Sequence, residues 1–158
     1  MAATLFVVGI AVCSACAGNS GNGIAVATDK HEYQQGEGIR IVFTNNSPES
    51  VFSHIRSLTP AFSIQHIEKK NTIEQWEKLY VQCQYPHCTY EIDAPGEIKA
   101  GESAALEWEP LVFVNGTPQT VLPEPGVYRL AISYEDNLKK KWLTAYTNIF
   151  SINSGRGE

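Results

Sequence analysis

Apolar residues in the central part of the chain recur at every second position, in short runs interrupted by Gly, Pro and Asn. Segment 39–45 shows this most clearly, because Ile39, Ile41 and Phe43 alternate with polar residues. Alternation places successive side chains on opposite faces of a strand, and no stretch of the chain keeps helical spacing over several turns. The pattern therefore predicts an all-β protein with Phe43 in its core.

Other segments continue this series of short, alternating runs. Residues Lys69, Lys70 and Asn71 are predicted to form a hairpin between two of them. Segment 73–79 also contains good helix formers, but its alternation favours a strand. Roughly seven or eight short strands with closely spaced turns indicate a single antiparallel, immunoglobulin-like β-sandwich. Besides 39–45, the expected strands are 24–28, 51–55, 61–68, 72–80, 104–108, 127–134 and 143–152.

Length and charge narrow the class of protein. A chain of 158 residues has the length of one domain, and its net charge of −5 offers no basic surface for nucleic acid. The sequence contains no Ser nucleophile elbow, no helix-borne His-Glu-x-x-His and no phosphate-binding Gly loop. We therefore expect a protein that is not an enzyme, needs no cofactor and binds no nucleic acid.

The first residues have the composition of an export signal. Segment 1–17 has no charged residue, and its apolar run 5–12 is too short to span a bilayer. Cys13-Ser14-Ala15-Cys16 resembles a bacterial lipobox, which implies lipidation of Cys16. The alternative is cleavage after Ala17 by an ordinary signal peptidase, which would release a secreted protein.

These features divide the chain into four parts. Residues 1–17 are predicted to be a signal peptide, and the Gly, Asn and Ser residues of 18–23 a flexible tether. Residues 24–152 form the predicted sandwich, and the polar residues 153–158 a disordered tail. The protein is then expected in the bacterial cell envelope, touching the membrane only through a lipid anchor, or outside the cell.

Four stretches carry a family resemblance: 28–37 (TDKHEYQQGE), 39–47 (IRIVFTNNS), 98–103 (IKAGES) and 125–130 (PGVYRL). Together they resemble bacterial immunoglobulin-like domains of exported proteins and lipoproteins, and more distantly the BsuPI-type proteinase inhibitors. The resemblance implies an immunoglobulin-like sandwich, because its motifs specify turns and core positions. It also suggests a proteinase inhibitor or protease regulator as an alternative function.

Two further aromatic residues are predicted to be structural. Trp108 lies between Glu107 and Glu109, so that an inward ring would be flanked by two outward acids. Tyr128 follows Gly126 closely, and a Tyr at such a place can bury its ring while its hydroxyl bonds a nearby backbone group, as in a tyrosine corner.

Reactive side chains crowd together only between Cys83 and Cys88. In an oxidising compartment two cysteines at this spacing most simply form a disulfide. The alternative is a metal site made of Cys83, His87 and Cys88, completed by His54 or by His66 from a neighbouring strand.

The sequence thus predicts a non-enzymatic binding or structural domain of the cell envelope. Its partner would be another protein or an envelope ligand, contacted through the loops that a sandwich presents at its two ends. The alternatives are the proteinase inhibitor suggested by the resemblance and a metal-handling module built on Cys83, His87 and Cys88.

Overall fold

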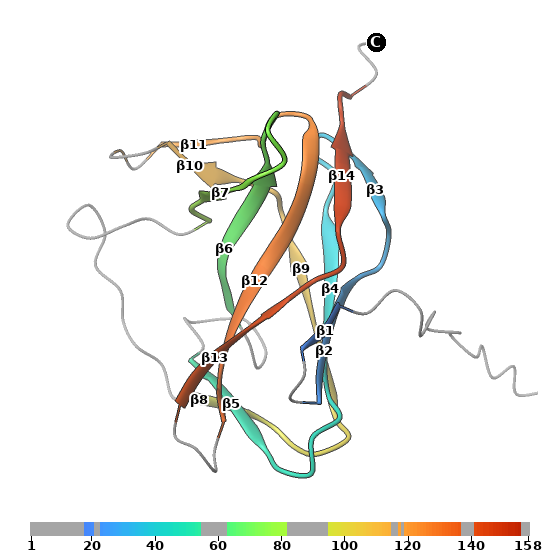
Figure 1. Cartoon of the computed structure of the whole chain (residues 1–158), viewed down its shortest axis with the longest axis vertical. Coiled ribbons are helices and arrows are strands. Elements are labelled where there is room, and N and C mark those ends of the chain that lie inside the picture. The colour runs from blue at the N-terminus through green and yellow to red at the C-terminus, as the bar shows by residue number, and fades with distance from the viewer. Residues whose placement is uncertain are drawn as a thin grey trace, which may run out of the picture.

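The computed structural model describes residues 18–20, 23–54, 63–81, 95–114, 117, 119–136 and 141–155. All the regular structure in these residues is β-strand (Figure 1). The described residues include no helix that could cross a membrane. The all-β sandwich predicted from the alternating pattern is confirmed.

The first sheet contains four antiparallel strands in the order β1-β2-β4-β9. The bounds of β2 and β4 are those expected from the alternation, and the side chains at their alternate positions are buried. The strands are β1 (Gly18–Ser20), β2 (Ile24–Thr28), β4 (Ile39–Asn45) and β9 (Ser103–Trp108).

The second sheet is organised around one long strand, β12 (Gly126–Asp136), which runs through its middle (Figure 1). One edge of β12 pairs with two strands, β6 (Ser63–Lys70) and β5 (Val51–His54). Its other edge pairs with β13 (Lys141–Tyr146) and β14 (Phe150–Asn153). Three strands lie further out, namely β7 (Trp76–Leu79) on β6, β8 (Pro95–Ile98) on β5 and β3 (Glu32–Gln34) on β14. A separate hairpin pairs β10 (Val112–Phe113) with β11 (Thr120–Val121).

This strand order is that of an immunoglobulin-type sandwich. The order β2-β4-β9 corresponds to strands A, B and E, and β14-β12-β6-β7 corresponds to G, F, C and C′. One pair departs from the expected antiparallel arrangement, because β3 runs parallel to β14. After β2 the chain crosses from the first sheet to the second without reversing, so that β3 meets β14 in the same direction.

The core lies between the two sheets and is rich in aromatic rings. Phe43 is fully buried and packs edge-to-face on Tyr134, with ring centroids 5.8 Å apart. Tyr128 is also fully buried, and its hydroxyl donates to the backbone oxygen of Glu124 in the turn before β12. Trp108 is only partly buried and packs against the margin of the core.

Gly126, at the start of β12, lies against the side chain of Lys69. A Cβ atom on Gly126 would lie 2.9 Å from Cε of Lys69, so the aliphatic part of the Lys69 side chain occupies the space that a larger residue would need. Lys69 continues past Gly126 to form an ion pair of 2.7 Å with Glu124.

Two sequence expectations about elements are wrong. Segment 18–23 is not wholly a tether, because Gly18–Ser20 forms β1 and pairs with β2. Segment 143–152 is not one strand, because the side chain of Thr147 interrupts it: its hydroxyl accepts the N–H of Leu130 at 3.0 Å. The hairpin expected at Lys69, Lys70 and Asn71 is confirmed, since β6 and β7 pair across that turn.

Candidate functional site

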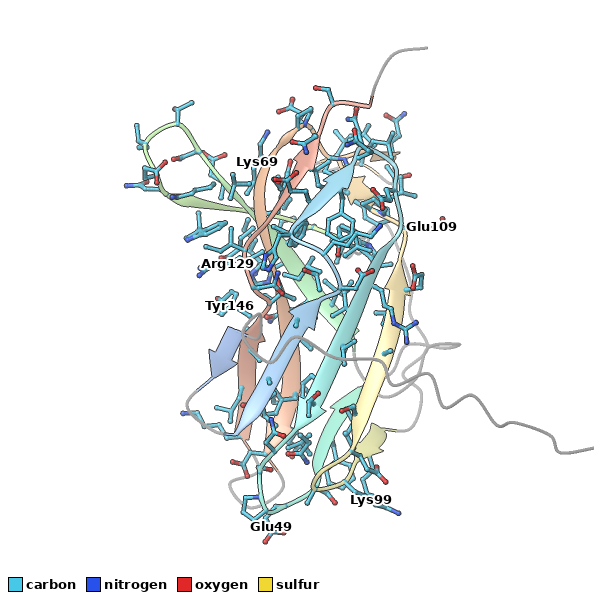
Figure 2. All side chains as sticks on the ribbon, turned by 90° about the vertical axis from the view of Figure 1, so that its right-hand side faces the viewer. Glu49, Lys69, Lys99, Glu109, Arg129 and Tyr146 are labelled. Carbon is cyan, nitrogen blue, oxygen red and sulfur yellow. The ribbon has the colours of Figure 1, made fainter. Side chains whose placement is uncertain are left out.

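The outer face of the second sheet gathers side chains from four strands. Residues of β12 alternate, so that Arg129 points away from the core while its neighbours Tyr128 and Leu130 are buried. Register brings Glu68 of β6 beside Arg129, and brings both His66 of β6 and Tyr146 of β13 beside Ala131. Further out, Lys78 of β7 lies beside Glu68. Figure 2 shows Arg129 and Tyr146 close together on this side of the molecule.

The guanidinium group of Arg129 lies between two aromatic rings. Its Cζ atom is 4.3 Å from the ring centroid of Trp76 on β7 and 4.2 Å from that of Tyr146 on β13. These strands lie on opposite sides of β12, so the rings approach from both sides. Stacking of this kind typically contributes about 0.5 to 2 kcal/mol per contact, depending on exposure. The side chain is nevertheless 27% exposed, so that part of it remains accessible.

Glu68 fixes the orientation of Arg129. Its Oε2 atom accepts from both Nε and Nη2 of Arg129, each at 2.6 Å. Its Oε1 atom lies 3.2 Å from Nε2 of His66. Hydrogen bonds to charged groups are stronger than neutral ones, and the Glu68 side chain is only 13% exposed. The guanidinium is therefore held in place before any partner arrives.

His66 lies next to this ion pair, and its imidazole is largely buried. Its side chain is 8% exposed, and burial is the main cause that lowers its pKa. The hydrogen bond to Glu68 raises the pKa in opposition, while the positive charges of Lys78 and Arg129 lower it further. Nε2 faces the Glu68 carboxylate, and the other ring nitrogen, Nδ1, is buried and has no hydrogen-bond partner among the described residues.

We name this set the Arg129 cluster, and it consists of His66, Glu68, Trp76, Arg129 and Tyr146. Arg, Trp and Tyr are the residue types most enriched at the energetic centres of protein interfaces. Of these five residues, sequence reasoning singled out only His66, as a possible metal ligand, and none as part of a recognition surface. The available signal was that Trp76, Arg129 and Tyr146 each lie in a predicted strand. Whether these side chains meet depends on the register between the strands, which the sequence does not show.

A second surface feature lies between the β10–β11 hairpin and the β6–β7 hairpin. It is a groove of about 330 Å³ with a mainly apolar lining. Lys69, Glu77 and Glu124 are the charged residues of its lining. Nothing in the described residues shows what would occupy it. The apolar residues that line it are Leu79, Val112, Phe113, Val114, Val121, Leu122 and Pro123.

Most of the reactive residues singled out in the sequence lie outside the described residues. Cys16, Cys83, His87 and Cys88 are among them, so that the lipidation, the disulfide and the metal site stay predictions. In the described ranges, no group of three or more His, Cys, Asp or Glu side chains could hold a metal ion.

The histidine partners suggested for that metal site come from strands that do not pair. His54 belongs to β5 and His66 to β6, and each of these strands pairs with β12 rather than with the other. Glu107 and Glu109, which flank Trp108, are exposed.

Comparison with known proteins adds no family. No protein-family model matches the chain, and no curated protein sequence is significantly similar to it. The resemblance to bacterial immunoglobulin-like domains and to BsuPI-type inhibitors therefore stays a prediction about ancestry.

Proposed function

We propose that this protein is an exported domain of the bacterial cell envelope, anchored through Cys16, that binds another protein and has no catalytic activity of its own. The uncharged segment 1–17 and the Cys13–Cys16 tract support export and anchoring. The observation that carries the binding role is the stacked and ion-paired side chain of Arg129 on the outer face of a rigid sheet.

The geometry of the cluster suits recognition better than proton transfer. Both oxygens of Glu68 are already engaged, one by Arg129 and the other by His66. The His66 imidazole is enclosed, and a general base must reach the proton that it removes. In contrast, a guanidinium whose position is fixed in advance loses little conformational entropy when a partner binds.

In-cell photo-cross-linking tests the binding role. A photo-reactive amino acid replaces Thr144, an exposed residue that lies in register with Ser133 of β12. The matched control position is Ser103 on β9, which is exposed on the other sheet. We expect a discrete protein adduct from position 144, none from position 103, and loss of the adduct when Arg129→Gln is added. No adduct from position 144, or an adduct that Arg129→Gln leaves unchanged, would refute the proposal.

Mass spectrometry of the mature N-terminus tests the anchor. We expect acyl chains on Cys16. An unmodified N-terminus at Gly18 would instead show cleavage after Ala17 and a secreted protein, while leaving the binding role open to the cross-linking test.

A further inference from the structure

The surface around the Arg129 cluster carries more positive than negative charge. Arg129 and Lys78 lie in register on the two sides of Glu68, so that one carboxylate stands between two cations and is bonded to Arg129. Lys78 is exposed and forms no ion pair with the residues that the structure describes; its Nζ atom lies 5.6 Å from the ring centroid of Tyr80. This local excess of positive charge stands out in a chain of net charge −5.

The charges around this surface do not remove the excess. Lys70, one row further along β6, is paired with Glu74 in the hairpin turn. Glu135 lies on the same face of β12, six positions after Arg129, or about 20 Å along the strand. At that separation, water and salt screen its charge from Arg129. The cationic pair Arg129 and Lys78 therefore remains partly uncompensated.

The stacking leaves one route to the guanidinium. Trp76 and Tyr146 approach from the two sides, and Nε and Nη2 are directed at Glu68. The remaining N–H donors of Arg129 have no acceptor among the described residues. A carboxylate that approaches in the plane of the group can accept from these donors, because a guanidinium matches the geometry of a carboxylate.

Apolar surface adjoins this cationic spot. Val127, two residues before Arg129 on the same face of β12, is 37% exposed. The rings of Trp76 and Tyr146 are partly exposed at its flanks. A partner that offered only charge would leave these side chains in water, whereas apolar neighbours of its carboxylate would cover them.

We propose that this face binds a protein segment in which an Asp or Glu side chain is flanked by aromatic or aliphatic side chains. The carboxylate bonds Arg129 and is attracted by Lys78. The flanking side chains pack on Trp76, Tyr146 and Val127. This inference rests on the proposed function and adds the chemistry of the partner to it.

Synthetic peptides test this chemistry on the full-length protein in detergent. One labelled peptide alternates Glu with Leu and Phe, a second has Gln in place of Glu, and a third has Lys. Fluorescence anisotropy gives the dissociation constant of each. We expect the Glu peptide to bind about tenfold more tightly than the Gln peptide, and the Lys peptide to bind least tightly. Raising the salt concentration should reduce the preference.

Three variants assign the preference to this surface. Lys78→Gln should reduce the tenfold preference to about threefold, and Arg129→Gln should abolish it. Lys99→Gln makes the same change of charge at an exposed residue near the lower end of the molecule in Figure 2, far from Arg129, and should leave the preference unchanged. Because Lys78 is exposed and has no ion-pair partner in the part of the chain that the structure describes, its variant decides the outcome if Arg129→Gln does not fold.

Equal affinity of the wild-type protein for the Glu and Gln peptides would overturn the inference, as would equal effects of Lys78→Gln and Lys99→Gln. The inference would also be overturned if the protein bound oligosaccharides but not the Glu peptide, and if Trp76→Ala abolished the oligosaccharide binding. The ligand of this surface would then be a sugar. If position 144 still gives an Arg129-dependent adduct in these cases, the proposed function stands. Absence of the adduct refutes the proposed function whatever the peptides do.

Discussion

Truncation of Phe43 to Ala tests whether the core lies where the alternating pattern and the structure place it. The side chain is 0% exposed and lies in register between Val26 of β2 and Ala104 of β9. Removing a buried Phe ring typically costs about 3 to 5 kcal/mol, of which an edge-to-face pair such as that with Tyr134 contributes about 0.5 to 1.5 kcal/mol. For a folded unit of roughly 130 residues, this loss corresponds to a melting temperature lower by about 11 to 18 K.

Thermal and urea melts followed by circular dichroism measure this loss. Ile73→Ala is the control, because Ile73 is 68% exposed and its truncation should change the stability by less than about 0.5 kcal/mol. Phe43→Leu keeps most of the apolar volume and should lie between the two, so it provides a measurement if Phe43→Ala does not fold. A melting temperature of Phe43→Ala no lower than that of Ile73→Ala would refute the placement of this strand in the core.

Three further outcomes are expected. Burial lowers the folded-state pKa of His66 below about 6.5, so that on acidification the unfolded chain binds a proton at this residue before the folded protein does. Melts at different pH values should therefore show that the stability falls as the pH drops below about 6.5, and that it falls less steeply in His66→Gln. Asn45→Ala should cost about 2 to 4 kcal/mol in urea unfolding, because the Asn45 amide donates to the backbone oxygens of Glu49 and Ile98. Thiol titration of protein from an oxidising compartment should find Cys83 and Cys88 without free thiols, and elemental analysis should find no stoichiometric zinc or copper.

The alternating pattern predicted the strands that bury one of their two faces along their whole length. Strand β4 has the predicted bounds because Ile39, Ile41 and Phe43 must all reach the core, and a shift of one residue would expose them. Asn45 ends this strand with a buried amide that holds the following turn, which gives a physical reason for the asparagine there.

Elements that depend on backbone pairing alone were not predictable. Strand β1 consists of Gly18, Asn19 and Ser20, whose side chains have little preference for strands, and it exists because β2 offers an edge to pair with. The interruption between β13 and β14 depends on one hydroxyl, that of Thr147, which takes the place of a backbone oxygen opposite Leu130.

The candidate site was missed for a related reason. Trp76 precedes Arg129 by more than fifty positions, and Tyr146 follows it on another strand. The sequence suggests that each lies on a strand, but the register between the strands decides whether the three side chains meet. The sequence also drew attention to Cys83 and His87, because reactive residue types are conspicuous in a chain, whereas a recognition surface of ordinary residues is not.

If Cys16 carries the proposed lipid anchor, the pairing of β1 with β2 determines how far the domain can stand from a bilayer. Only Ala17 separates Cys16 from β1, so an acyl anchor on Cys16 would be joined to the folded body by a span of about 7 Å at most. A free tether of six residues would instead allow an average reach of about 13 Å. Such a domain would meet partners almost entirely within the plane of its own membrane. A short tether increases the effective concentration of other proteins bound to that membrane, and it keeps the domain from reaching proteins on an opposing surface.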